Sequence, residues 1–220
     1  MTDTRAESWF HITNSGAHAE ISLFGDIGRG RGRTVGAQAF IRELNALGDS
    51  KALTVRINSP GGDVFEAIAI YNALRARRGK VTCIVDGLAA SAASFIAMAG
   101  DEVVMRPNTE MMVHDALIDG MRGNAATLRD TADQLERASN TIASIYAEKA
   151  GGTADTWRAV MRTDTWYSAE EAVAAGLADR VDATRPRTAR APAIAAHTPV
   201  HRTTVLVAAA RRRRAHRKSR

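Results

Sequence analysis

Residues 85–100 read Val-Asp-Gly-Leu-Ala-Ala-Ser-Ala-Ala-Ser-Phe-Ile-Ala-Met-Ala-Gly, and this stretch decides how the neighbouring chain folds. A short apolar run over 81–85 precedes Gly87, and Ser91 then opens a run of residues that favour a helix. The order predicts a strand, a turn and a helix, with the Ser91 hydroxyl at the helix N-terminus. Unpaired N–H groups there can stabilise a negatively charged oxygen. Ser91 is therefore a candidate nucleophile with Ser94 as a rival, although such a serine is more often a helix N-cap.

A second stretch of the sequence also predicts a strand, a turn and a helix. Residues 53–57 indicate a buried strand, and Asn-Ser-Pro-Gly-Gly-Asp follows at 58–63. Paired glycines allow backbone conformations closed to other residues, so N–H groups can turn outward. Apolar residues at helical spacing come next, and we expect Asp63 to support the first turn of that helix. The alternative is a plain connection between strand and helix; the glycine patterns of nucleotide-binding loops are not present.

Strands alternate with helices along the chain. We expect strands at 21–25, 53–57, 81–85, 102–105 and 111–114, and helices at 35–47, 64–77 and 91–99. A long helix over 124–149 and two short helices follow. This order predicts an α/β fold of repeated βαβ units with parallel strand pairing.

Four segments, taken together, resemble the Clp protease proteolytic subunit. They are residues 57–62, 87–91, 111–114 and 164–179, in that family's order and near its spacing, and the resemblance covers about 19–181. It implies the ClpP/crotonase-like αβ superhelix. Ala-Ala after Ser91 and Asp-Ala after His114 depart from the housekeeping pattern and favour the related head-maturation proteases of tailed phages and prophages.

Carried over by position, the resemblance makes Ser91 the nucleophile, His114 the general base and Asp164 the residue that orients the histidine. The backbone N–H groups of Gly62 and Ala92 would form the oxyanion hole. The chemistry agrees with these roles, because a serine hydroxyl is a poor nucleophile until an imidazole takes its proton. The imidazole in turn needs a buried carboxylate to hold its tautomer.

Each of these residues also has an alternative outside catalysis. His114 could end a strand with its ring satisfied, and Asp164 could cap the helix that begins near Ser168. Asp115 is nearer to His114 in sequence than Asp164 is. Adjacent residues on a strand point to opposite faces, however, so Asp115 is badly placed to orient its own neighbour.

The long helix carries an apolar stripe, because Leu128, Leu135 and Ile142 are spaced seven apart. It resembles the handle by which two rings of this family dock, and the alternative is that the stripe packs against its own domain. We expect a homo-oligomeric ring, and two stacked rings are an open alternative.

Charge divides the chain of 220 residues. Residues 185–220 hold 11 of the 30 Lys and Arg residues and no acid, whereas residues 1–184 have a net charge of −5. We expect an N-terminal segment at 1–18, a peptidase domain at 19–184 and a disordered basic tail at 185–220. The tail could contact nucleic acid electrostatically, or it could have no function.

Several features limit the biochemical class. Cys83 is the single cysteine and is expected to be buried, no Cys/His cluster has the spacing of a metal site, and we expect no cofactor. No apolar stretch reaches the roughly 18 residues of a membrane span, so a cytoplasmic protein without membrane contact is expected.

The expected function is that of a serine endopeptidase that makes limited cuts in capsid or scaffold proteins during phage head maturation. One alternative is a housekeeping Clp subunit that works with a Clp ATPase, an ATP-dependent unfoldase. Another is a crotonase-type acyl-CoA enzyme, which would share the oxyanion hole but needs a catalytic carboxylate and a CoA site that are not readable here.

Overall fold

The computed structural model describes residues 12–15, 18–28, 34–49 and 51–182. The strands are β1 (Ile12–Ser15), β2 (His18–Phe24), β3 (Asp26–Ile27), β4 (Thr34–Val35), β5 (Ala52–Ser59), β6 (Val81–Ala90), β7 (Glu102–Met105), β8 (Glu110–Val113), β9 (Thr165–Ser168) and β10 (Arg180–Val181). The helices are α1 (Ala37–Ala46), α2 (Val64–Arg75), α3 (Ala92–Ala97), α4 (Ala125–Ala150), α5 (Ala154–Met161) and α6 (Ala169–Ala174). The expectation for the basic tail lies outside the described residues, as does most of the expected N-terminal segment.

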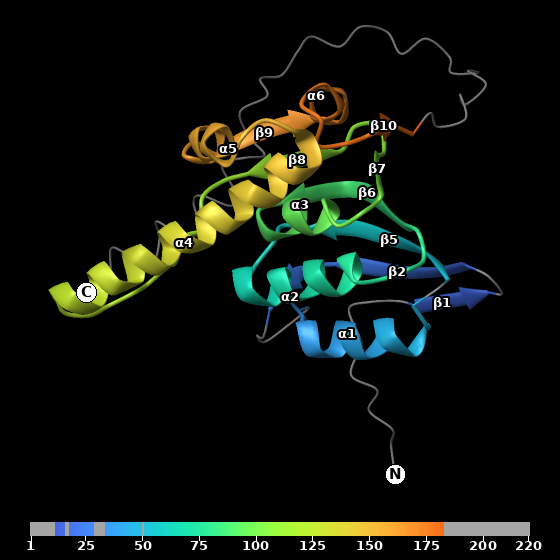
Figure 1. Ribbon diagram of the computed structural model, residues 1–220, viewed down its shortest axis with the longest axis horizontal. Coiled ribbons are helices and arrows are strands. Elements are labelled where there is room, and N and C mark those ends of the chain that lie inside the picture. Colours follow the sequence, from blue (N-terminus) through green and yellow to red (C-terminus); the bar gives the residue numbers. More distant parts are fainter. Residues whose placement is uncertain (1–11, 16–17, 29–33, 50, 183–220) are drawn as a thin grey trace, which may run out of the picture. The chain divides into compact units, whose positions relative to one another are not determined.

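The strands confirm the α/β class (Figure 1). The main sheet has the order β1-β2-β5-β6-β7-β10, and all its pairs are parallel except β1 with β2. The pairs β1–β2 and β8–β9 are antiparallel, and neither β1 nor β9 was among the expected strands. For β1–β2 the reason is the connection: residues 16–17 are too few for the crossover that a parallel pair needs.

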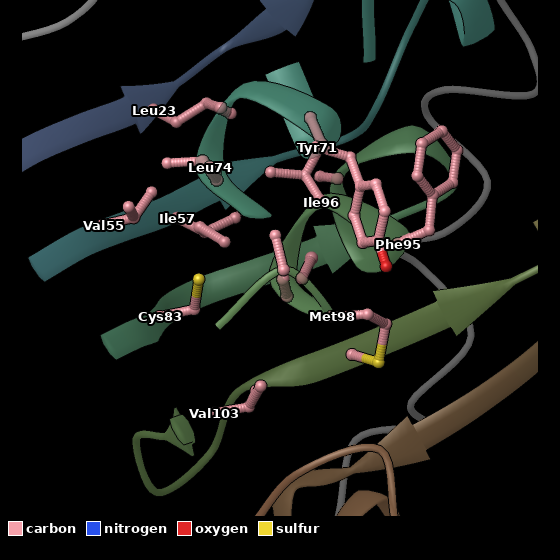
Figure 2. Close-up of a cluster of buried hydrophobic side chains, with 14 of the residues drawn as sticks. Leu23, Val55, Ile57, Tyr71, Leu74, Cys83, Phe95, Ile96, Met98 and Val103 are labelled. Atoms are coloured by element: carbon pink, nitrogen blue, oxygen red, sulfur yellow. The ribbon is translucent and has the colours of Figure 1, made fainter. Parts of the chain in front are cut away.

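The apolar core lies between this sheet and the helices α1, α2 and α3. Alternate strand residues point to that side, and Figure 2 shows them against side chains of α2 and α3. The labelled members are Leu23, Val55, Ile57, Tyr71, Leu74, Cys83, Phe95, Ile96, Met98 and Val103. Cys83 is buried as expected, and this burial raises the pKa of its thiol to about 12. A thiol that stays protonated is a weak nucleophile, so Cys83 is a packing residue of the core and not a reactive group.

The residues between these point to the opposite face of the sheet, which carries a row of ion pairs. Each acid in the row contacts a base on a neighbouring strand or at a strand end, with N–O separations of 2.5–3.9 Å. In order along the row, the members are Glu20, Arg56, Asp86, Arg106, Asp182, Arg180, Glu102 and Lys80. The side chains of this row are between 14% and 61% exposed, so water reaches this face of the sheet.

The ten-residue strand β6 serves two parts of the structure. Its first half pairs with β5 and β7, and its last residues pair with β8. The strand is longer than the expected 81–85, because the backbone stays extended through Gly87 up to Ala90. β6 therefore runs from the core directly to Ser91.

Helix α4 has two different halves. Its C-terminal half buries Ala138, Ile142 and Tyr146 against the domain, whereas residues 124–130 are exposed and Leu128 is 46% exposed. Figure 1 shows this first half extending away from the sheet. The stripe therefore packs against its own domain in the C-terminal half of the helix, and ring docking by the exposed half stays a prediction. Among the helices that the structure describes, none combines the length and apolar character of a membrane span.

Candidate active site

The pairing of β6 with β8 brings Ser91 and His114 together. Ala90 is opposite Met112, and the Ser91 N–H donates to the Met112 carbonyl at 2.9 Å. The two strands run parallel, so their carboxyl ends lie side by side. Ser91, which follows β6, and His114, which follows β8, therefore face one another. His114 Nε2 lies 2.6 Å from Ser91 Oγ. A neutral imidazole with its proton on Nδ1 accepts the serine hydroxyl in this geometry.

Strand β9 places Asp164 on the other side of the ring. β9 runs antiparallel to β8 with Val113 opposite Thr165, so the preceding residue, Asp164, comes beside His114. Its Oδ1 lies 3.5 Å from His114 Nδ1, an ion-pair distance beyond the usual hydrogen-bond range. The carboxylate side chain is 72% exposed, so the expectation of a buried carboxylate is wrong for the single chain. Asp164 is exposed because it lies in the connection between α5 and β9, just before the pairing of β9 with β8 begins.

The alternative uses of these acids do not occur. Ser168 itself caps α6, in a capping box with Glu171, so the interpretation of Asp164 as that cap is wrong. Asp115 pairs with Arg158 on α5, whereas His114 has Asp164 as its acidic partner. Arg158 is 7% exposed and also contacts Glu136 of α4 at 2.7 Å. These ion pairs tie the segment after His114 to two helices.

Ser91 has an unusual backbone conformation. It stands at the N-cap position of α3 with φ 53° and ψ −123°, which is rare for a residue with a side chain. Its side chain makes no capping hydrogen bond, so the N-cap interpretation is wrong and the hydroxyl faces His114 instead. Such conformations cost about 1–3 kcal/mol and are found where function requires them.

Ser94 does not compete for the imidazole. Its side chain is fully buried, and its Oγ lies 2.5 Å from the Ser91 carbonyl oxygen and 2.6 Å from the Tyr146 hydroxyl. The two serines therefore have different partners, and the structure favours Ser91 over its rival.

The glycine turn brings a second backbone segment against Ser91. Gly61 has φ +97°, and a Cβ there would lie 2.6 Å from the Ala90 carbonyl oxygen and 2.7 Å from Ser91 Cβ. Only a residue without a side chain allows this approach. The Asp63 side chain caps α2 through the N–H groups of Phe65 and Glu66, each at 2.9 Å, and so supports the helix as expected.

Two N–H groups are available for an oxyanion. Ile27 donates to the Gly61 carbonyl and accepts from the Asp63 N–H, so the Gly62 N–H faces away from Ile27. Neither the Gly62 N–H nor the Ala92 N–H donates to a protein acceptor within the described part of the chain. α3 has only six residues, so local N–H groups matter here more than a helix dipole.

A cavity of about 210 Å³ adjoins Gly62 and the segment after His114. Its walls come from the start of α2, the segment 116–118 and the middle of α4, and three of its apolar residues are more than half exposed: Phe65, Leu117 and Ile118. Sequence reasoning missed this cavity. The available signal was the apolar pair at 117–118, which follows the histidine within a polar stretch.

Among the residues that the structure describes, no group of three or more His, Cys, Asp or Glu side chains could hold a metal ion. The absence of a cofactor stays a prediction.

Comparison with known proteins identifies relatives of this site. The family model described as Clp protease matches residues 5–185. An ATP-dependent Clp protease proteolytic subunit from Pleurastrum terricola is 37% identical over 142 residues, which is 64% of this chain and 72% of the relative. Proteolytic subunit 3 from Synechococcus sp. (strain CC9902) is 31% identical over 184 residues, 82% of this chain and 91% of the relative. The subunit from Bacteroides fragilis is 30% identical over 146 residues, 66% and 70% respectively. These similarities give no support to the phage head-maturation variant.

Proposed function

This chain belongs to the Clp protease family of serine endopeptidases, and we propose that it cleaves peptide bonds with Ser91, His114 and Asp164 as its catalytic triad. The observation that carries the proposal is the 2.6 Å separation of Ser91 Oγ and His114 Nε2. A hydroxyl at this distance can pass its proton to the imidazole as it attacks. The crotonase alternative is set aside, because the family model and the relatives that match this chain are Clp proteases and not acyl-CoA enzymes.

The reaction follows from the positions of these groups. Ser91 Oγ attacks the carbonyl carbon of the scissile bond, and its proton moves to His114 Nε2. The carbonyl oxygen becomes an oxyanion, to which Gly62 and Ala92 donate their N–H groups. His114 then protonates the leaving amine as the C–N bond breaks. Water hydrolyses the acyl-enzyme by the same steps, with His114 again as base.

We assign Asp164 the role of holding the imidazole with its proton on Nδ1. The 3.5 Å separation has to shorten by about 0.6 Å to become an ordinary hydrogen bond. Catalytic hydrogen bonds are often long in the free enzyme and tighten when substrate binds. The exposure of the carboxylate fits this picture, because a substrate or a neighbouring subunit can cover it.

The cavity beside Gly62 suggests what the enzyme prefers to cut. Its position next to Gly62, one of the two N–H donors, suits a substrate side chain near the scissile carbonyl. Phe65, Leu117 and Leu135 contribute apolar walls, and Thr131 and Gln134 contribute polar ones. We propose that it accepts a medium-sized apolar side chain.

We further propose that the chain works as the proteolytic subunit of an ATP-dependent Clp protease, in an oligomeric ring served by a separate Clp ATPase. The support is that the relatives described above are all proteolytic subunits of ATP-dependent Clp proteases, together with the exposed first half of α4, which suits contact with another subunit. The head-maturation reading, with a capsid or scaffold protein as substrate, rests only on residues 92–93 and 115–116. It is the second candidate.

A fluorophosphonate probe tests the triad, because only an activated serine reacts with it. The wild-type protein should be labelled, and mass spectrometry of the labelled peptides should place the probe on Ser91. Ser91→Ala should lose labelling and reduce peptide hydrolysis by several orders of magnitude at unchanged oligomeric state. Labelling at another serine, or full activity of Ser91→Ala, would refute the assignment.

A second assay separates the two partners. An unfolded protein substrate should be degraded faster when a Clp ATPase and ATP are added, and Ser91→Ala should abolish that degradation. Cleavage of a co-expressed capsid protein without ATP, with no stimulation by the ATPase, would favour head maturation instead.

A further inference from the structure

We propose that Ser94 and Tyr146 are positioning residues that hold the peptide group between Ser91 and Ala92, and with it one of the two oxyanion donors. The inference rests on the proposed function, because it assigns a role to groups that surround the same nucleophile. Neither residue touches the reacting atoms.

The direction of the hydrogen bonds is settled by chemistry. A carbonyl oxygen can only accept, so the Ser94 hydroxyl donates its one hydrogen to the Ser91 carbonyl oxygen at 2.5 Å. The Tyr146 hydroxyl, 2.6 Å from Ser94 Oγ, must then be the donor to Ser94. The Ser94 N–H adds a further bond to the same carbonyl oxygen at 3.0 Å. The Ser91 carbonyl is thus held by two donors, one of which is itself held from α4.

Holding this carbonyl also aims the Ala92 N–H. The two groups belong to one planar trans peptide and point in opposite directions. The Ser91 backbone lies in a region, φ 53° and ψ −123°, where the surrounding structure has to impose the conformation. The hydroxyl of Ser94 supplies such a constraint, and without it the peptide plane has fewer contacts to resist rotation.

Burial makes the arrangement specific to these two side chains. Ser94 is 0% exposed and Tyr146 is 1% exposed, so bulk water cannot replace either hydroxyl. Burial also raises the pKa of Tyr146 well above its usual value, which keeps the phenol protonated and able to donate. The Trp157 ring packs against Tyr146 with centroids 5.4 Å apart and fixes the ring. Since α4 also lines the cavity beside Gly62, one helix forms part of the cavity wall and supports the oxyanion peptide through Ser94.

The test compares Tyr146→Phe, Ser94→Ala and the double variant with the wild type. Two readouts are needed: kcat and KM on a small peptide, and inhibition by a peptide aldehyde, whose tetrahedral adduct places an oxyanion in the same hole. A misplaced donor is less harmful than the loss of a donor, so we expect kcat to fall about 10-fold in Ser94→Ala and about 3-fold in Tyr146→Phe. KM should stay within about 2-fold of the wild-type value. The affinity of the enzyme for the aldehyde inhibitor should fall in proportion to kcat/KM. The double variant should match Ser94→Ala, because Tyr146 acts only through Ser94.

Controls separate positioning from general stability. Tyr71→Phe removes a hydroxyl from the other strongly buried tyrosine, on α2, and should leave kcat and aldehyde inhibition unchanged. Ser94→Cys keeps a weaker donor and should give a kcat between those of the wild type and Ser94→Ala.

The proposal is overturned if Ser94→Ala keeps the wild-type kcat at the wild-type oligomeric state, or if its kcat falls without any change in aldehyde affinity. Tyr146→Phe answers the same question if Ser94→Ala does not fold. Labelling of wild-type Ser91 by the fluorophosphonate probe is measured first. Its failure would remove the triad and this inference together, whereas labelling with an unaffected Ser94→Ala removes the inference alone.

Discussion

A single methyl group at Gly61 should disable the nucleophile while a methyl group at Gly48 should not. The Gly61 Cβ would lie 2.6 Å from the Ala90 carbonyl oxygen, 2.7 Å from Ser91 Cβ and 2.8 Å from Ala92 N. Ordinary contacts begin at 3.4 Å, so these atoms have to separate by roughly 0.8 Å. The atoms that move include the nucleophile's own side chain and an oxyanion donor.

The magnitude has two parts. A residue with a side chain in a left-handed conformation costs about 1–2 kcal/mol, and this applies at Gly61 with φ +97° and at Gly48 with φ +76°. The overpacked methyl adds about 1–3 kcal/mol at Gly61 only, because nothing lies within 4 Å of a Cβ at Gly48. For activity, a displacement near 1 Å at a catalytic group costs about 100-fold in rate. Gly61→Ala should therefore lose about 100-fold in kcat and about 2–5 kcal/mol in stability.

The assay measures kcat on a fluorogenic peptide, the rate of fluorophosphonate labelling and unfolding in urea for both variants. Gly48→Ala should show only the small loss of stability, with the wild-type kcat. The reasoning is refuted if the two variants lose kcat equally, or if Gly61→Ala is as active as the wild type while folded.

Three further predictions follow from the charges. Asp164→Asn should lower kcat by orders of magnitude without changing assembly, because the amide no longer holds the His114 tautomer; an unchanged kcat would exclude Asp164 from the triad. Burial raises the pKa of all three tyrosines, so the unfolded chain loses protons above about pH 10 that the folded chain keeps, and the free energy of unfolding should fall as the pH rises further. The absorbance of ionised Tyr71, Tyr146 and Tyr167 should accordingly appear at higher pH in the native protein than in urea. Titration of the native and the unfolded protein at the same pH would contradict this. Arg158→Met should cost about 2–4 kcal/mol in urea unfolding, because it leaves a partly buried carboxylate without its base. The exposed pair of Arg78 with Asp49 is the control, and Arg78→Met should leave the midpoint unchanged.

The local part of the site was predictable from the sequence. The apolar run at 81–85 and the alanine-rich segment after Ser91 are strong signals of strand and helix, and both elements are present. Strand β9 was not predicted, since its four residues lead straight into the capping box of α6 and resemble the approach to a helix. Its pairing with β8, more than fifty residues earlier, is a long-range contact that no local pattern encodes. The resemblance named Asp164, and only the antiparallel register explains how it reaches His114.

Side-chain partners inside the domain were also beyond the sequence. The apolar stripe of α4 was readable from the sequence, and Tyr146 in the C-terminal half of that helix is buried. Its hydroxyl bond to Ser94 depends on how α4 packs against α3, which periodicity does not specify. Likewise, the buried position of Arg158 follows from acids on two other segments, Asp115 and Glu136.

The double use of β6 restricts how the length of this chain can vary in evolution or by design. One residue inserted between Val81 and Ser91 would advance the backbone by about 3.3 Å and turn each following side chain to the opposite face. Either the core or the nucleophile would then be out of place, because the same strand holds both. The connection 117–123 between β8 and α4 belongs to no strand ladder and is exposed throughout. Homologues that differ in length should therefore differ there, while the distance in sequence from Val81 to Ser91 stays constant.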